Sequence, residues 1–462
     1  MLKISNHYVS KIVSILLGVE ILILLSAAYL GVNIRFVGGS HWATNFAEFL
    51  PSNCAFVVSI VFGMSALGMY QRNLNGGLRT TFLRIMPSFA MGLGILIVVF
   101  YVAPELYLGR GILLLAFFFA GVGILLARAI FFKFSKSEFL ASRIIFLGIG
   151  ELARECSVVA SGISDNKYHI VGYVSVGSET NCVPQGNIFC ADESLLTIAR
   201  RHDVNEIVVA LQNRRGASGR INELLECKLS GIRVIESAAF FEREVCQIRV
   251  DSLLPSWLVF GTGFDQTTLR VFFKRFFDIL TSVILLIFTA PIMLLAALCI
   301  FIEDRAPIFY QQERVGKDGD CFMVIKFRSM RNDAEQSGKP QWASSNDPRI
   351  TRVGSIIRKL RIDELPQILN VLKGEMSFVG PRPERPYFVR QLSKEILFYN
   401  VRHSVKPGIT GWAQVRYQYG SSVEDAIQKL QYDLYYVKNN SLFLDILILI
   451  DTLRVVLFGA GR

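Results

Sequence analysis

The chain has 462 residues, of which 52 % are apolar and 19 % are charged, and its formal net charge at pH 7 is +11. This apolar excess excludes a disordered or low-complexity protein and favours a membrane protein over a wholly soluble one. The length allows roughly two to four domains, at about 100–200 residues each. The basic charge is compatible with nucleic acid, anionic lipid or a phosphorylated substrate as a partner.

Four apolar stretches dominate residues 1–140, a region that contains no Asp. Each is long enough to cross a hydrocarbon core of about 30 Å at about 1.5 Å per residue. Loops rich in Lys and Arg alternate with loops that have fewer, so the positive-inside rule predicts a four-helix transmembrane bundle with both ends in the cytoplasm. Glu20 and Pro87 inside the bundle mark either helix packing or a ligand path. The four stretches are Ile12–Ile34, Cys54–Tyr70, Phe82–Val102 and Ile112–Phe132.

Residues 141–265 have the composition of a soluble α/β domain. Strand-like runs alternate with helical ones, which predicts a Rossmann-like domain with a parallel sheet. The G-x-G-x-x-A run from Gly148 to Ala153 follows the first strand. It either places a nucleotide pyrophosphate at a helix N-terminus or permits tight strand–helix packing. The predicted strands are Arg143–Leu147, His169–Val174, Glu206–Leu211 and Arg233–Ile235.

A membrane bundle joined to such a domain also suits a sugar-nucleotide dehydratase or epimerase, which is one alternative function. The short-chain form of these enzymes needs a Tyr-x-x-x-Lys acid/base pair, and no Lys in this sequence has a Tyr four residues before it. The eight Cys include no C-x-x-C pair, so neither a zinc site nor a disulfide framework is predicted.

A fifth apolar stretch covers residues 274–302. Pro291 divides it into halves of roughly 22 and 18 Å, at about 1.5 Å per residue, and neither half spans a membrane alone. Basic residues flank both ends, so a crossing would carry a basic C-terminal region outside. We therefore predict a reentrant helix–break–helix that enters one leaflet and returns, with a kinked fifth span as the alternative. Lys274 or Arg275 is expected to pair with Asp278.

Two adjacent carboxylates, Asp363 and Glu364, precede Pro366. Pro366 suits the first turn of a helix that ends at Gly374, so both carboxylates are expected at the helix N-terminus, where backbone N–H groups favour anions. Adjacent helical side chains diverge by about 100°, which favours divided roles: one carboxylate attacks, while the other holds a metal or manages protons. The alternative is that the pair only caps its helix and forms surface ion pairs.

Basic side chains accompany this pair along the chain, and they would keep an Asp ionised and bind phosphate oxygens. One of them, Arg382, lies in the rigid turn Gly380-Pro381-Arg382-Pro383. Nucleic acid is not the expected partner, because no known binding module is present and the region follows a membrane-inserted segment. The candidates for phosphate contact are Lys326, Arg328, Arg349, Arg352, Arg358, Pro381 and Arg382.

Five motifs occur in order after residue 270: Lys274-Arg275…Asp278…Pro291, Lys326-Phe327-Arg328-Ser329-Met330, Asp363-Glu364-Leu365-Pro366-Gln367, Gly380-Pro381-Arg382-Pro383 and Lys406-Pro407-Gly408-Ile409-Thr410-Gly411. Together they resemble the bacterial sugar transferase family, the monotopic phosphoglycosyl transferases. The four spans and the Rossmann-like (CoA-binding-like) domain are similar to its large, polysaccharide-initiating subclass. The run Pro381–Pro386 resembles exopolysaccharide enzymes associated with exosortase systems. Ala290 departs from members that have Ser before the breaking Pro.

This resemblance implies transfer of a sugar 1-phosphate from a UDP-sugar to undecaprenyl (polyprenyl) phosphate, with release of UMP, as the first membrane step of exopolysaccharide assembly. By the same likeness Asp363 attacks the sugar-bearing phosphate and forms a covalent aspartyl intermediate, while Glu364 helps to hold Mg²⁺. The catalytic domain, residues 266–462, would face the cytoplasm at the bacterial inner membrane, where the anchor meets membrane lipid. A non-enzymatic scaffold for polysaccharide export is a second alternative. The sequence leaves open which sugar is transferred and whether the protein is a homo-oligomer.

Overall fold

The computed structural model describes residues 2–35, 46–70, 77–135, 141–162, 167–176, 180–184, 187–190, 193–211, 220–250, 263–264, 267–305, 307–331, 349–417 and 422–458. The chain forms two compact units, one of Met1–Ile4 with Tyr8–Val245 and one of Ser5–His7 with Cys246–Arg462. Two short strands, β1 (Leu2–Ile4) and β2 (His7–Val9), precede the first helix. The predicted domain boundary at residue 265 falls inside the second unit, and the division into three domains stays a prediction.

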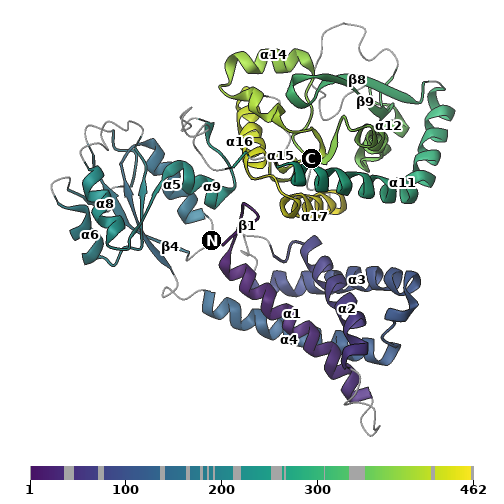
Figure 1. Cartoon of the computed structure of the whole chain (residues 1–462), viewed down its shortest axis with the longest axis horizontal. Helices are drawn as coiled ribbons and strands as arrows, with labels where there is room; N and C mark the ends of the chain where they lie inside the picture. The colour runs from purple at the N-terminus through teal and green to yellow at the C-terminus, as the bar shows by residue number, and fades with distance from the viewer. Residues whose placement is uncertain are drawn as a thin grey trace. The chain divides into compact units, whose positions relative to one another are not determined.

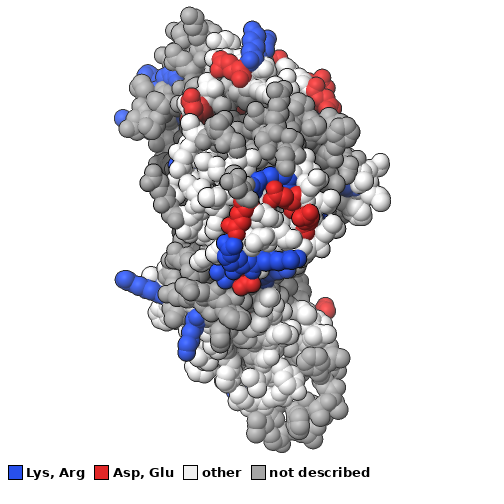
Figure 2. Space-filling model, turned by 90° about the vertical axis from the view of Figure 1, so that its left-hand side faces the viewer, with Lys and Arg blue, Asp and Glu red and all other residues white. Residues whose placement is uncertain are grey.

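Each of the first four apolar stretches forms a long helix. These helices are α1 (Lys11–Arg35), α2 (Phe46–Ala66), α3 (Gly77–Val102) and α4 (Arg110–Ser135), with the short helix η1 (Pro104–Leu106) between the last two. All four are long and apolar enough to cross a membrane. The lower part of Figure 2, which these helices form, shows hardly any Lys, Arg, Asp or Glu among its described atoms. The protein is therefore membrane-associated, while the direction of each crossing stays a prediction.

A buried ion pair joins α1 to α4. Arg128 Nε lies 2.6 Å from Glu20 Oε1, and Arg128 Nη2 lies 3.2 Å from Glu20 Oε2. Both side chains are at most 1 % exposed. A bidentate pair of this kind neutralises a carboxylate that would be costly alone in an apolar bundle. Of the two roles considered for Glu20, the structure supports helix packing.

A five-stranded parallel sheet follows, with strand order β5-β4-β3-β6-β7. Helices α5 (Glu151–Gly162) and α9 (Ser237–Val245) cover one face, and α6 (Leu195–Arg201) and α8 (Ile221–Leu229) cover the other (Figure 1). The four predicted strands and their parallel arrangement are confirmed, whereas the two-residue β5 was not predicted. The strands are β3 (Ser142–Leu147), β4 (Tyr168–Val174), β5 (Ile188–Phe189), β6 (Glu206–Val209) and β7 (Arg233–Glu236).

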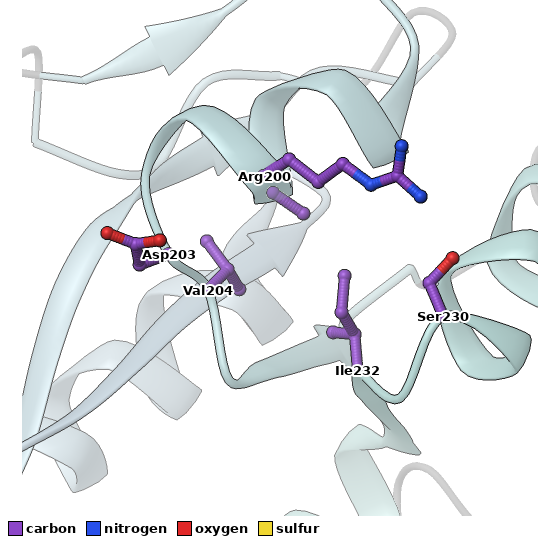
Figure 3. Close-up of a pocket in the computed structure, with 6 residues that line it drawn as sticks. Arg200, Asp203, Val204, Ser230 and Ile232 are labelled. Atoms are coloured by element: carbon purple, nitrogen blue, oxygen red, sulfur yellow. The ribbon is translucent and has the colours of Figure 1, made fainter.

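Close packing explains the glycine turn after β3. Gly148 has a φ of +124°, and a Cβ there would lie 2.6 Å from the carbonyl oxygen of Ala210, so only glycine fits. A hollow of about 340 Å³ in this domain lies where β6 and β7 begin (Figure 3). Ligands of such sheets bind at the opposite, carboxyl edge, so this hollow gives no support to nucleotide binding by the glycine turn. The hollow is lined by Ala199, Arg200, Asp203, Val204, Ser230 and Ile232.

The second unit holds the motif residues found in the sequence. It begins with the long helix α11 (Thr268–Asp304) and contains an antiparallel pair, β8 with β9, and a parallel pair, β10 with β11. Its other elements are β8 (Phe309–Val315), η4 (Lys317–Gly319), β9 (Cys321–Phe327), α12 (Arg352–Lys359), η5 (Ile362–Gln367), α13 (Ile368–Lys373), β10 (Ser377–Val379), α14 (Pro386–Glu395), η6 (Tyr399–Ser404), β11 (Gly408–Thr410), α15 (Trp412–Arg416), α16 (Val423–Asn439) and α17 (Leu442–Phe458).

α11 is one helix with a sharp bend. The helix continues across Pro291, and Figure 1 shows two arms that meet at an angle. Proline bends a helix because it lacks the N–H group and clashes with the preceding turn. Thr289 Oγ1 donates to the carbonyl oxygen of Leu285 (2.7 Å), so a hydroxyl group does bond back to the helix beside the bend, one position before Ala290. The predicted break is thus a bend within one helix. By length and composition α11 could also cross a membrane, so the return of the chain to the same side stays a prediction.

Buried polar contacts fasten the first turns of α11. Lys274 Nζ donates to Asp445 Oδ2 on α17 (2.7 Å). Asp278 Oδ1 accepts hydrogen bonds from Ser377 Oγ (3.0 Å) and from the backbone N–H of Phe378 (3.1 Å). Asp278 was expected to pair with Lys274 or Arg275, but its hydrogen bonds come from β10. Lys274 pairs instead with Asp445 on α17.

Candidate active site

A tight turn presents Asp363 and Glu364. α12 ends at Lys359, and Arg361 then takes a left-handed conformation with a φ of +57°, which redirects the chain into η5. This conformation is costly for a residue that has a side chain. The predicted helix stop is confirmed, because Gly374 caps α13 with a φ of +91°. The two carboxylates lie in the first turn of η5, close to where the sequence predicts them.

Glu364 is buried among cations. Its Oε1 accepts hydrogen bonds from Arg382 Nη2 (2.8 Å) and Lys326 Nζ (3.1 Å), and its Oε2 lies 3.7 Å from Arg361 Nη1. Burial acts to raise the pKa of Glu364, but these three cations outweigh it and hold the pKa well below its usual range. Two predicted phosphate-binding residues, Lys326 and Arg382, therefore meet at one carboxylate.

Asp363 lies beside this cluster without joining its hydrogen bonds. Within the described part of the chain, no group donates a hydrogen bond to its carboxylate. Burial and the neighbouring Glu364 raise the pKa of Asp363 to about 6, against the attraction of Lys326, Arg358 and Arg361. The nearby cations thus do not lower this pKa below its ordinary value, although the carboxyl is still mostly ionised at pH 7. The predicted divergence of the two carboxylates, with separate roles for each, stays a prediction.

The turn that carries Arg382 is supported by backbone bonds and by a buried ion pair. The backbone N–H of Gly408 donates to the carbonyl oxygen of Pro381 (3.0 Å). Arg402 Nη2 donates to the carbonyl oxygen of Arg382 (2.9 Å) and to Asp433 Oδ2 (2.8 Å). Arg402 and Asp433 were not predicted from the sequence, because no motif joins these two residues to the turn that they support.

Lys326 is positioned by β9, which Asn370 ties to α13. Asn370 Nδ2 donates to the carbonyl oxygen of Met323 (2.7 Å), and its Oδ1 accepts from the backbone N–H of Ile325 (3.1 Å). Burial lowers the pKa of Lys326, while Glu364 acts against this shift. Arg314 on β8 is a further, partly buried cation near Lys326, and the sequence did not predict it as a phosphate contact.

Three other predicted phosphate contacts are placed around the junction of α11 and α12. Arg328 Nη2 donates to the carbonyl oxygens of Asp304, the last residue of α11, and of Arg305, the residue after it (3.0 and 3.1 Å). The backbone N–H of Arg352 donates to Glu303 Oε1 (2.9 Å), and Arg349 lies in the short segment just before α12. These contacts explain Arg328 as a cap of α11, and the phosphate roles of all three residues stay predictions.

The site can supply part of a magnesium shell. Among the described residues, no group of three or more His, Cys, Asp or Glu side chains gathers as a metal site. Mg²⁺ is usually held by one or two carboxylates together with substrate phosphates, so a complete protein cage is not required. Glu364 Oε2, paired only loosely with Arg361 at 3.7 Å, is a hard oxygen donor of this kind. Glu364 could therefore supply one oxygen to Mg²⁺ beside a bound phosphate, and magnesium binding stays a prediction.

Comparison with known proteins relates this unit to a family of sugar transferases. The model of the bacterial sugar transferase family matches residues 269–459. The UDP-N-acetylgalactosamine-undecaprenyl-phosphate N-acetylgalactosaminephosphotransferase of Aeromonas hydrophila is 44 % identical over 238 residues, which are 52 % of this chain and 55 % of that protein. The undecaprenyl-phosphate glucose phosphotransferase of Komagataeibacter xylinus is 44 % identical over 191 residues, which are 40 % of this chain and 36 % of that protein.

A shorter relative is covered almost completely. The exopolysaccharide production protein PSS of Rhizobium leguminosarum bv. phaseoli is 42 % identical over 188 residues, which are 39 % of this chain and 92 % of that protein. The chain therefore belongs to the bacterial sugar transferase family. The matched part of the chain spans about half or less of the Aeromonas and Komagataeibacter proteins.

Proposed function

We propose that this protein transfers a sugar 1-phosphate from a UDP-sugar to undecaprenyl phosphate and releases UMP. The observation that carries this proposal is the contrast between two adjacent carboxylates: Glu364 is bonded to two cations, whereas Asp363 receives no hydrogen bond from the described residues. A carboxylate without donors stays nucleophilic, and the cations beside it attract a diphosphate. The Aeromonas and Komagataeibacter relatives are both named for transfer to undecaprenyl phosphate, which supports the same acceptor here.

The reaction would proceed in two displacements at one phosphorus atom. An oxygen of Asp363 attacks the phosphorus that bears the sugar, the bond from that phosphorus to the bridging oxygen breaks, and UMP leaves with this oxygen. Arg382 and Lys326 bind phosphate oxygens in exchange for part of their contact with Glu364. An oxygen of the lipid phosphate then attacks the same phosphorus and frees the Asp363 carboxylate. Mg²⁺, held by Glu364 and phosphate oxygens, would neutralise charge on the diphosphate.

We propose that α11 is a monotopic anchor at the cytoplasmic face of the inner membrane, and the packing around α11 supports the return of this helix to one side. Before α11, the backbone N–H of Ile248 donates to the carbonyl oxygen of Gln431 (3.0 Å), and that of Phe264 donates to the carbonyl oxygen of Lys438 (3.1 Å). After the bend, Glu303 accepts hydrogen bonds from the start of α12. Segments on both sides of α11 thus pack into one unit, which a crossing helix would separate. Such an anchor keeps Asp363 within reach of both a soluble nucleotide and a lipid phosphate.

Radiolabelled UDP-sugars, offered one at a time to membranes that contain the protein, test this function. Wild-type protein should release UMP and transfer label to lipid, and Asp363→Asn should reduce both by at least about 10³-fold, because the nucleophile is lost. Asp320→Asn removes an exposed carboxylate of the same unit and should keep near-normal turnover.

The outcomes separate the proposal from its alternatives. Normal turnover by Asp363→Asn would reject the nucleophile assignment. Conversion of a UDP-sugar that requires NAD and no lipid would favour a dehydratase or epimerase. A wild-type protein that turns over no UDP-sugar but supports polysaccharide export in cells would favour a scaffold.

A further inference from the structure

A second cation cluster lies at the first turns of α11. Arg275 Nη1 and Nη2 donate to the carbonyl oxygens of Val371 and Leu372 (2.5 and 2.7 Å), near the end of α13. Arg275 Nη2 and Lys406 Nζ both lie within 3.5 Å of the point where a side chain at Gly374 would begin. The two cations therefore come together over the backbone of Gly374, where a glycine keeps a side chain from lying between them.

Lys406, the other cation of this cluster, has no hydrogen-bond partner among the described residues. Within the described ranges, no carboxylate or carbonyl oxygen accepts a hydrogen bond from its Nζ. Lys274, the neighbouring cation, is already bonded to a carboxylate on α17. Burial lowers the pKa of Lys406, and Arg275, Lys317 and Lys274 lower it further, while Asp278 acts against them. A half-buried cation among like charges is stabilised when an anion joins it.

The cluster lies beside apolar rings that face outward. Phe272, Phe273 and Phe276, on the same turns of α11 as Arg275, are each more than half exposed. Exposed aromatic side chains next to basic ones are typical of a helix at the boundary between water and lipid. An anion that reaches Lys406 would therefore come from the membrane surface.

The same segment is in contact with the turn that carries Arg382. A Cβ at Gly380 would lie 2.4 Å from the carbonyl oxygen of Lys406, so the backbones of the two loops touch. A phosphate held at Lys406 would thus be bound by a loop that packs directly on the Arg382 turn of the candidate active site.

We infer that Arg275 and Lys406 form a binding site for the phosphate of a membrane lipid. The Lys406 ammonium and the N–H groups of Arg275 that are not bonded to α13 would donate to phosphate oxygens. Polyprenyl phosphate and an anionic phospholipid offer the same chemistry. If polyprenyl phosphate occupies the site, which rests on the proposed function, the site holds the acceptor of the second displacement.

Native mass spectrometry of the full-length protein in detergent, titrated with undecaprenyl phosphate or with phosphatidylglycerol, tests this site. Lys406→Gln should weaken retention of at least one of these lipids about tenfold, because one charge-assisted contact is lost. Lys406→Arg keeps the charge and should retain the lipid. Lys373→Gln removes an exposed lysine from α13, close in sequence to Gly374, and should bind as wild type does.

Weaker retention of undecaprenyl phosphate alone would identify the acceptor site, and weaker retention of phosphatidylglycerol would identify an anchoring site. Equal retention of both lipids by wild type and Lys406→Gln would overturn the inference. Equal loss in Lys406→Gln and Lys373→Gln would also overturn it, because any exposed charge would then suffice. Retention does not depend on turnover, so a protein that binds lipid through Lys406 but transfers no sugar would refute only the proposed function.

Discussion

Two turns of this protein carry motif residues at the start of a helix, and they are built differently. The turn at Gly148 is explained by packing alone, since a Cβ there would lie 2.6 Å from the carbonyl oxygen of Ala210. The turn at Asp363 contains more than packing requires: a left-handed Arg361, a buried Glu364 shared by cations, and a carboxylate without a donor among the described residues. A glycine that matches a motif is thus weak evidence of a ligand site. Stronger evidence is a cluster of charged side chains that packing alone does not require.

Removal of divalent cations should have the largest effect, and it should affect activity at the Asp363 turn but not stability at the Gly148 turn. Chelation with EDTA should abolish UMP release, and added Mg²⁺ should restore it, because the diphosphate needs its charge neutralised. The melting temperature should change little, because the Gly148 turn and the cores depend on packing. UMP release that persists in EDTA would contradict the proposed metal role of Glu364.

Arg382→Gln should lower kcat/KM for the UDP-sugar by about 10²–10³, because a cation that stabilises the transferring phosphate is lost. Steady-state kinetics of UMP release measure this effect. Arg390→Gln, an exposed arginine on α14, is the matched control and should stay within about twofold of wild type. A loss below tenfold in Arg382→Gln would remove this residue from the candidate site.

Gly148→Ala should act on stability and leave the chemistry intact. The new Cβ meets a backbone oxygen in a conformation that favours glycine, which should cost about 2 kcal/mol of unfolding free energy. Gly162→Ala is the control, because nothing lies within 4 Å of the new atom. Thermal or denaturant unfolding measures the difference. If Gly148→Ala instead lowered turnover at unchanged stability, a ligand role for this turn would be favoured over packing.

The pH dependence should show the raised pKa of Asp363. Protonation removes the nucleophile, so activity is lost on the acid side: kcat/KM should fall about tenfold per pH unit below about pH 6 and level off above it. A pH–rate profile between pH 4 and 8 measures this limb. If kcat/KM instead began to fall only near pH 4, the ordinary pKa of an Asp, the surrounding cations would outweigh burial.

Features set by local sequence were predictable. Apolar length indicated the helices α1 to α4, alternation of strand-like and helical runs indicated the parallel sheet, and Gly374 marked the end of α13. The start was predicted less well: Pro366 was expected in the first turn of the helix, but it lies near the end of η5, which begins at Ile362. The sequence also predicted that basic residues from separate turns lie near the carboxylate pair. Lys326 and Arg382, which both bond to Glu364, are such residues.

Partners that are distant in sequence were not predictable. The support of Arg382 by Arg402 and Asp433, and the pairing of Lys274 with Asp445, depend on how separate elements pack, which a single sequence does not record. The pKa of Asp363 was missed for a related reason: the sequence shows nearby cations but not the burial that outweighs them.

The most direct test of the account is to mix purified protein with a labelled UDP-sugar in the absence of lipid phosphate, quench it, and locate the label by peptide mass spectrometry. We expect one labelled sugar phosphate per active molecule, attached to the Asp363 carboxylate and released on addition of undecaprenyl phosphate. Label bound to another residue, or full turnover with no covalent label at any time, would contradict the account.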